Sequence, residues 1–243
     1  MKRFFLIHIP KTAGTAVNDA LSAALPSIVH IESKPEVLPK LRGETAERFV
    51  SGHILAPRAL SFLNRPEWFV FTFLREPVEH LISHLKWCQH VATTPQFPKY
   101  DVATQLVCTR LAELDLSDIV GLSELLAELP QARKYFDNCQ TRYLSGCMPQ
   151  GLLDDSHLAI ALKVANTLDF VGFSENLKEG MEVVRVATGL PKIEVARANE
   201  ARTAKRPDLT DPKVLDWYRK TVALDASLYS QMRKSQETSP QLC

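Results

Sequence analysis

Hydrophobic positions along the chain fall into two alternating kinds of segment. Five short runs are dense in aromatic and β-branched residues and are bounded by proline, glycine or charged residues, which is typical of buried strands. These runs are residues 3–9, 27–32, 48–54, 68–74 and 169–174. Apolar residues recur at helical spacing over residues 14–24, 35–42, 57–63, 77–91, 121–135, 154–167, 175–188 and 211–234. Alternating strands and helices predict an α/β fold of three layers, with a central parallel sheet flanked by helices.

Three segments interrupt this alternation. Residues 92–118, which begin "ATTPQFPKYD", predict an insertion that forms part of an acceptor-side wall. Residues 190–212 are polar, basic and bounded by prolines, which indicates a long ordered loop, and residues 235–243 predict a frayed tail. The 243 residues show no internal repeat, and we expect a single domain over residues 1–243.

The charge balance argues against polyanionic partners. Lys and Arg number 29 against 28 Asp and Glu, so the net charge is +1 and no global field recruits nucleic acid or an anionic membrane. Any anion site must therefore be local. No apolar stretch approaches the roughly 20 residues that span a bilayer, and we expect no membrane span.

The cysteines favour a cytoplasmic protein. Five are present, an odd number, and none forms a CxxC pair. This usage favours reduced thiols, with a disulfide or a zinc role as the alternative. The short apolar run at residues 3–9 lacks the small-residue cleavage site of a signal peptide and is followed by Pro10 and Lys11, so it predicts a first strand.

The turn after the first strand is a candidate phosphate site. A strand that runs through small residues into a helix is a backbone shape that binds phosphate well, because a helix start offers free N–H donors and a positive dipole end. Ala13, Gly14 and Ala16 let backbone approach an anion closely, and Lys11 adds a positive charge. Thr12 and Thr15 add hydroxyl donors. The sequence lacks the GxxxxGK[ST] pattern of nucleoside-triphosphate P-loops, and a plain turn with an exposed lysine is the alternative.

Two further candidates follow later strands. In "FTFLREPVEHLISHL" (71–85), Arg75 can fork onto two phosphate oxygens and Ser83 can donate to a third. The alternative there is an ordinary Arg75–Glu79 surface pair. In "FVSGHI" (49–54), His53 follows Gly52 near a strand end, where ligands of parallel sheets bind. A structural histidine is the alternative.

Together these pieces resemble a known enzyme family. The segments "IPKTAGT", "SGHI", "REPVEHLISHL", "DNCQTRYLSG" and "DFVGFSENL" resemble, in order and spacing, the sulfotransferases that use 3′-phosphoadenosine 5′-phosphosulfate (PAPS). The resemblance spans roughly residues 3–230 and is greatest to the branch of heparan sulfate uronyl 2-O-sulfotransferases and their small bacterial relatives. It implies a P-loop-like fold and PAPS as co-substrate, with no metal.

The resemblance also implies roles for particular residues. The loop that would hold the 5′-phosphosulfate comprises Lys11, Thr12, Ala13, Gly14, Thr15 and Ala16, with Lys11 beside the bridging oxygen of the leaving group. Arg75 and Ser83 would hold the 3′-phosphate, and His53 would be the catalytic base. The basic residues Arg202, Lys205 and Arg206 resemble a late loop that closes over the nucleotide.

Two positions depart from the family pattern. Ser51 stands where the uronyl enzymes often have a second histidine, which weakens the case for a uronyl substrate. His80 stands where arginine is usual in the motif that begins at Arg75.

The expected reaction is sulfuryl transfer by in-line displacement. Such a reaction depends on positioning and charge stabilisation rather than on covalent catalysis. His53 would take the acceptor hydroxyl proton, and Lys11 would stabilise the departing bisphosphate. The acceptor is expected to be a small hydroxylated metabolite, a lipid or an unsulfated saccharide. The alternatives are a P-loop kinase or nucleoside triphosphatase, which needs Mg²⁺ and an acidic ligand that the strand ends do not offer, and a non-catalytic nucleotide-binding protein.

Overall fold

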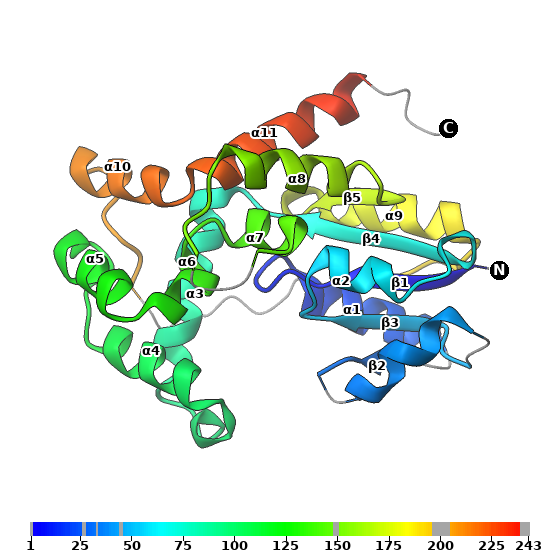
Figure 1. Cartoon of the computed structure of the whole chain (residues 1–243), viewed down its shortest axis with the longest axis horizontal. Coiled ribbons are helices and arrows are strands. Elements are labelled where there is room, and N and C mark those ends of the chain that lie inside the picture. The colour runs from blue at the N-terminus through cyan, green and yellow to red at the C-terminus, as the bar shows by residue number, and fades with distance from the viewer. Residues whose placement is uncertain are drawn as a thin grey trace.

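A five-stranded parallel sheet forms the centre of the molecule (Figure 1). The computed structural model describes residues 2–25, 28–32, 34–43, 46–147, 151–195 and 205–238. The strand order is β2-β3-β1-β4-β5. The strands are β1 (Arg3–Ile7), β2 (Ile28–His30), β3 (Phe49–Gly52), β4 (Trp68–Leu74) and β5 (Phe170–Phe173). Because β1 lies between β3 and β4 in register, with Phe5 opposite Val50 and Val70, its whole length is buried.

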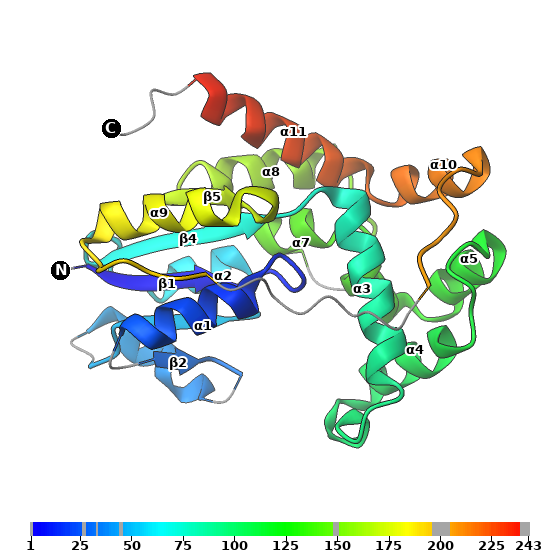
Figure 2. The ribbon, with the colours of Figure 1, turned by 180° about the vertical axis from the view of Figure 1, so that it is seen from behind.

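Helices cover both faces of this sheet. The α-helices are α1 (Gly14–Ala24), α2 (Ala56–Ser61), α3 (Pro77–Val91), α4 (Val102–Ala112), α5 (Ile119–Glu128), α6 (Arg133–Phe136), α7 (Cys139–Ser145), α8 (Asp155–Ala165), α9 (Leu177–Thr188), α10 (Pro212–Thr221) and α11 (Ala223–Thr238). Short 3-10 helices lie at Pro35–Arg42, Arg65–Glu67, Phe97–Lys99, Pro130–Ala132 and Ser174–Asn176. Helices α1 and α9 lie on one face, and α2, α7, α8 and α11 lie on the other (Figures 1 and 2).

The alternation of side chains along β1 explains the two sheet faces. Phe4 and Leu6 pack into the cluster that contains α1 and α9, whereas Phe5 and Ile7 pack into the cluster that contains α7, α8 and α11. A strand that is buried on both faces needs a continuous apolar run, as the sequence of β1 has. The α/β prediction of three layers around a parallel sheet is therefore confirmed.

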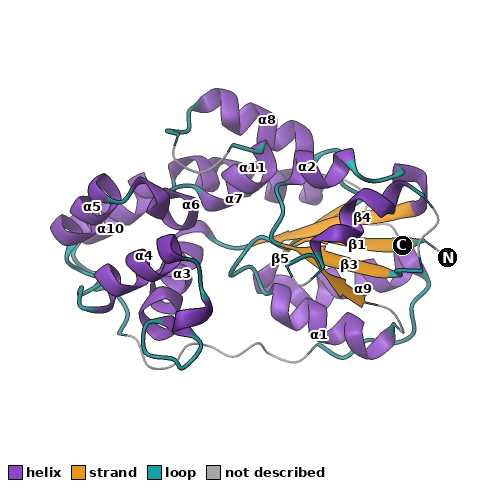
Figure 3. Ribbon diagram, turned by 60° about the horizontal axis from the view of Figure 1, so that its bottom comes forward, coloured by secondary structure: helices purple, strands orange, loops and turns teal. Residues whose placement is uncertain are grey.

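A separate group of helices stands beyond the carboxyl ends of the strands. Helices α3, α4, α5, α6 and α10 share their own hydrophobic cluster. The carboxyl ends of the strands point toward this group. Figure 3 shows the sheet on one side of the molecule and these helices on the other. The sheet edge and the helical group thereby face each other.

Several sequence-based predictions of helices need correction. Residues 121–135 do not form one helix, because α5 ends at Glu128 before Pro130 and α6 begins at Arg133. The expected helix 211–234 divides into α10 and α11. The short helix α7 was not predicted, and the segment 92–118 contains α4.

Two expectations lie partly outside the described residues. Of the tail 235–243, residues 235–238 continue α11 instead of fraying, and residues 239–243 lie outside the description. In the expected loop 190–212, residues 196–204 lie outside it, and helix α10 begins at Pro212. None of the helices in the described ranges is both long and apolar enough to cross a membrane.

Candidate functional site

The carboxyl ends of all five strands open into one cavity of about 1760 Å³. Its sheet-side wall carries residues that follow each strand: His8 after β1, Glu32 after β2, His53 after β3, Arg75 after β4 and Ser174 after β5. The opposite, helical wall comes mainly from α3, the start of α4, and α6. The cavity therefore lies where parallel sheets bind their ligands.

The turn between β1 and α1 presents backbone donors to this cavity. Lys11 and Ala13 both adopt left-handed backbone conformations, with φ of 66° and 70°, which non-glycine residues rarely occupy without compensation. Ala13 caps α1, and no side chain of the described residues accepts from the first turn of that helix. The N–H groups at the start of α1 are therefore available to an anion.

Gly14 permits a close approach at this turn. A Cβ atom at Gly14 would lie 2.0 Å from the ring of His8, so a larger residue would make that ring move. The imidazole of His8 lies over the beginning of α1 in its present orientation because this position carries glycine.

Three hydrogen bonds hold the turn in place. The Thr12 hydroxyl donates to the Ile9 carbonyl over 2.8 Å, the His80 imidazole donates through Nε2 to the Pro10 carbonyl over 2.7 Å, and Arg75 Nη1 donates to the Lys11 carbonyl over 3.2 Å. These contacts stabilise the two left-handed residues, one of them from Thr12 within the turn and two from α3 and Arg75. They also correct the expectation that the buried Thr12 hydroxyl faces an anion, whereas Thr15 is exposed and lines the cavity.

The remaining predicted loop residues divide in the same way. Lys11, Ala13 and Gly14 line the cavity with Thr15. Ala16 does not line it and is a buried residue of α1. Burial and the neighbouring Arg75 guanidinium both lower the pKa of Lys11. Its ammonium group also lies 5.9 Å from the centre of the Trp87 ring on the helical wall.

Arg75 and Ser83 both line the cavity, as the sequence predicted for a shared anion site. The Arg75 backbone is fixed by Gln140, whose side chain accepts from the Arg75 N–H over 2.9 Å and donates to its carbonyl over 3.0 Å. The Ser83 hydroxyl has no hydrogen-bond partner within the described part of the chain. The pair therefore offers a fixed guanidinium and a free hydroxyl to one ligand.

His53 directly follows β3, and its geometry suits a base. Its Nδ1 donates to the His8 carbonyl over 3.1 Å, which leaves the lone pair on Nε2. The backbone N–H of His53 donates to the Glu32 carboxylate, and the His53 ring stacks on the His8 ring with centroids 4.3 Å apart. These contacts fix both the tautomer and the direction of the ring.

The surroundings keep both stacked imidazoles neutral near pH 7. Desolvation by the cavity walls lowers the pKa of His53, while the Glu32 carboxylate and the His8 carbonyl act in the opposite direction and Lys11 lowers it further. Burial, with smaller contributions from His53, His30 and Lys11, lowers the pKa of His8 to about 3. A neutral imidazole can accept a proton, which is the state a general base requires.

Of the three basic residues expected to close over the nucleotide, only one lines the cavity within the described part of the chain. Arg206 lines the cavity and forms an ion pair with Glu79 of α3, whose carboxylate it holds at a lowered pKa. Lys205 is exposed and lies 3.9 Å from Asp115, away from the cavity lining. Arg202 lies outside the described residues.

The two departures from the family pattern both have structural partners. The buried Ser51 hydroxyl hydrogen-bonds His30 Nδ1 over 2.9 Å and does not reach the cavity. The buried His80 holds the Pro10 carbonyl, as described above. His80 therefore supports the β1–α1 turn, a role that the sequence did not reveal.

Sequence reasoning also missed three residues of this site. Glu32 at the end of β2 contacts His53, Gln140 fixes Arg75, and Trp87 faces Lys11. Gln140 lies within the segment "DNCQTRYLSG" that carried part of the resemblance, so a signal was present without a role attached to it. Glu32 and Trp87 carried none, because their contacts join segments far apart in the chain.

Comparison with known proteins supports the fold. No protein-family model and no curated protein sequence matches the chain. Among solved structures, it is similar to mouse sulfotransferase SULT7A1 complexed with PAP, with a TM-score of 0.53 and 10% identity over 98% of this chain and 89% of that one. At this identity the likeness establishes a shared α/β fold. It gives no support to the heparan sulfate branch in particular.

Proposed function

We propose that this protein is a sulfotransferase that moves the sulfuryl group of PAPS to a hydroxyl group of a small acceptor. The observation that carries the proposal is the meeting, in one cavity, of an uncapped helix start with Lys11, the Arg75–Ser83 pair, and His53 in the base tautomer. The motif order along the sequence and the fold shared with a PAP-bound sulfotransferase support it.

The two anion sites divide the donor between them. The N–H groups of the β1–α1 turn and Lys11 would hold the 5′-phosphosulfate, and Arg75 with Ser83 would hold the 3′-phosphate. Arg206, whose ion pair with Glu79 lies at the cavity rim, would approach the nucleotide from the helical wall.

The transfer step needs only these residues. The acceptor oxygen attacks sulfur while the bond from sulfur to the 5′-phosphate oxygen breaks, and the acceptor proton passes to Nε2 of His53. The negative charge that develops on the departing phosphate oxygen is stabilised by Lys11 and the backbone N–H groups. The products are the sulfated acceptor and adenosine 3′,5′-bisphosphate (PAP).

The helical wall suggests the acceptor class. Tyr100 and Tyr135 line the cavity from the helical wall, and Tyr143 lines it from α7. Aromatic side chains pack against sugar rings and other apolar faces while their hydroxyls hydrogen-bond. We therefore propose an uncharged hydroxylated metabolite, lipid or unsulfated saccharide as acceptor.

Transfer of radiolabelled sulfur from PAPS in the presence of a chelator tests this function. We expect label to appear in at least one member of a library of hydroxylated acceptors, and PAP to raise the Tm without Mg²⁺. At about 100 times its Kd, PAP would add roughly 2.7 kcal/mol to the free energy of unfolding. Stabilisation by ATP with Mg²⁺ and none by PAP would instead indicate a nucleoside-triphosphate enzyme.

A further inference from the structure

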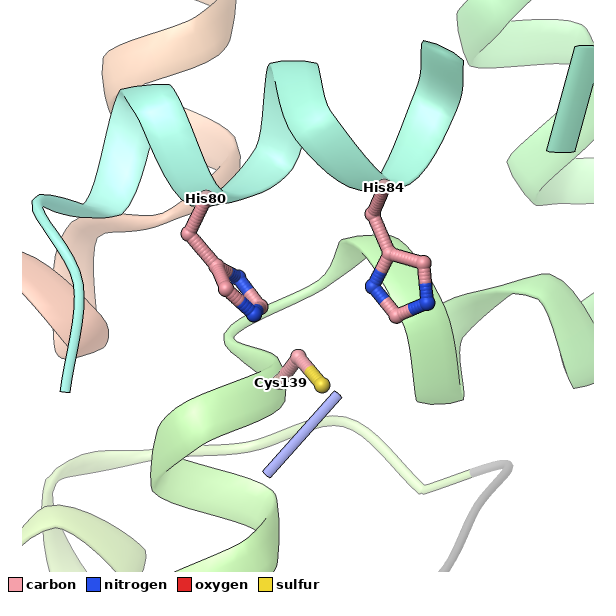
Figure 4. Close-up of side chains that lie close together, drawn as sticks. All are labelled: His80, His84 and Cys139. Atoms are coloured by element: carbon pink, nitrogen blue, oxygen red, sulfur yellow. The ribbon is translucent and has the colours of Figure 1, made fainter. Parts of the chain in front are cut away.

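Two histidines and a cysteine lie close together beneath the phosphate-binding turn. His80 and His84 are one helical turn apart on α3, and Cys139 begins α7. Each can offer one ligand atom, and the three atoms lie within 4.8 Å of one another. Figure 4 shows both imidazoles projecting from the same side of α3 toward the thiol. All three side chains are buried.

The cluster contains a buried polar atom that nothing satisfies. His84 Nδ1 has no hydrogen-bond partner among the described residues. Buried polar atoms of native proteins are nearly always paired, so an unpaired imidazole nitrogen calls for a ligand. Aromatic rings surround the rest of this imidazole, with Trp87, Tyr135 and Phe136 all in edge contact.

His80 has the second-sphere partner that metal-binding histidines use. Its Nε2–H donates to the Pro10 carbonyl, which leaves the lone pair of the neutral ring on Nδ1. A histidine that ligates through one nitrogen commonly donates from the other to a carbonyl. Two histidines four residues apart on one helix face are also a recurrent zinc-binding arrangement.

We propose that His80, His84 and Cys139 bind a zinc ion. Imidazole nitrogens and a thiolate are the donors that Zn²⁺ prefers, and the thiol proton is released when the metal binds. Zinc–ligand bonds of about 2.0–2.3 Å require donor atoms roughly 3.5 Å apart, so donor atoms that lie up to 4.8 Å apart would close in by about 1.3 Å at most. His84 is among the residues that line the cavity, which gives the ion a route of entry.

The role of this zinc would be structural. His80 joins the ion to the Pro10 carbonyl, and Pro10 precedes the left-handed Lys11. The ion would therefore tie α3 and α7 to the base of the turn. The sulfuryl-transfer step does not involve it, and the site stands whether or not the protein transfers sulfuryl groups.

Zinc content of the full chain, purified with any affinity tag removed, tests the proposal. We expect about one zinc per chain after dialysis against micromolar zinc, and a lower Tm after removal by a chelator that zinc alone restores. Cobalt substitution should give the thiolate-to-cobalt charge-transfer absorption of a Cys ligand. In Cys139→Ala that absorption should vanish, and in His84→Gln zinc affinity should fall at least about 10-fold.

Matched variants separate this site from adventitious binding. Cys88→Ala removes another buried thiol, and His90→Gln removes an exposed imidazole from the same helix; both should keep wild-type zinc content and the cobalt spectrum. If a variant fails to fold, X-ray absorption on wild-type protein still reports the ligands, and we expect two imidazoles and one sulfur. Wild-type protein that contains no zinc under these conditions would overturn the proposal. So would His84→Gln and Cys139→Ala variants that hold zinc as tightly as the wild type does.

Discussion

The two walls of the cavity are positioned by different kinds of interaction. On the sheet side, His53 and Arg75 each follow a strand by one residue, so the hydrogen-bonded sheet fixes where their side chains begin. On the helical side, Tyr135 is placed by a 2.7 Å hydrogen bond to Thr104, and Trp87 by an edge contact with Tyr100. One wall is set by backbone pairing and the other by side-chain packing.

This difference suggests a division of work. Chemistry needs groups held within a fraction of an ångström, which a sheet edge supplies, whereas selection of an acceptor needs a surface that side chains can reshape. We therefore expect substitutions of His53 and Lys11, the sheet-side residues placed beside the reacting atoms, to lower kcat, whereas Arg75 on the same wall should act on donor binding. Substitutions on the helical wall should mainly alter binding.

The largest effect is expected at His53. His53→Ala removes the base and should lower kcat by about 10²–10⁴-fold with donor affinity nearly unchanged. His30→Ala is the matched control, because His30 ends the adjacent strand β2, bonds Ser51 and does not line the cavity. Steady-state kinetics, PAP affinity and Tm on both variants provide the comparison. Near-normal turnover in folded His53→Ala would show that His53 is not the general base and would assign that role to another histidine.

Lys11 should show the next largest effect. Lys11→Ala removes the charge beside the leaving group and should lower kcat by about 10²–10³-fold, the range for loss of one preorganised stabilising group. Lys86→Ala removes a lysine that lines the same cavity from α3 on the helical wall, and we expect its kcat to change little. Equal losses of kcat in the two variants would mean that overall charge, rather than position, matters.

Arg75 and Ser83 should affect donor binding more than turnover. A hydrogen bond to a charged group contributes about 1.5–3 kcal/mol and a neutral one about 0.5–1.5 kcal/mol, so PAP affinity should fall about 10–150-fold in Arg75→Ala and about 2–10-fold in Ser83→Ala. The kcat at saturating donor should stay near wild type, because these contacts are remote from sulfur. Unchanged PAP affinity in both variants would refute the 3′-phosphate assignment.

The smallest effect concerns pH. The base must be neutral, and because the pKa of His53 is lowered from 6.5, activity should persist to below pH 6.5 before it falls. The Glu32 carboxylate raises that pKa, so Glu32→Gln should move the acid limb of kcat to still lower pH without changing the plateau. A shift to higher pH would show that Glu32 does not act through His53.

The sequence predicted the sheet better than the helices around it. Each strand was found within two residues of its bounds, because strands buried on both faces are continuous apolar runs between turn residues. The positions of the turn at residues 10–16 and of His53 could be predicted from the same strands, because each comes directly after a strand end. The Thr12 hydroxyl was misassigned because its inward direction depends on backbone conformations that its neighbours impose.

The missed break between α10 and α11 has a non-local cause, unlike the break at Pro130. The break between α10 and α11 contains neither glycine nor proline; instead, the Asn138 side chain accepts from the N–H groups of Leu224 and Asp225 at the start of α11. In return, the Asp225 carboxylate accepts from Gln140 and Thr141 at the start of α7. Helix starts that cap each other across 86 residues leave no local pattern in the sequence.

Titration calorimetry of the wild-type protein with PAP in the presence of a chelator tests the central claim most directly, because PAP carries both phosphates that the cavity is proposed to bind. We predict binding without metal that is at least about 10-fold tighter than that of adenosine 5′-phosphate, with the advantage lost in Arg75→Ala. Equal affinity for the two nucleotides, or a preference for ATP with Mg²⁺, would contradict the account.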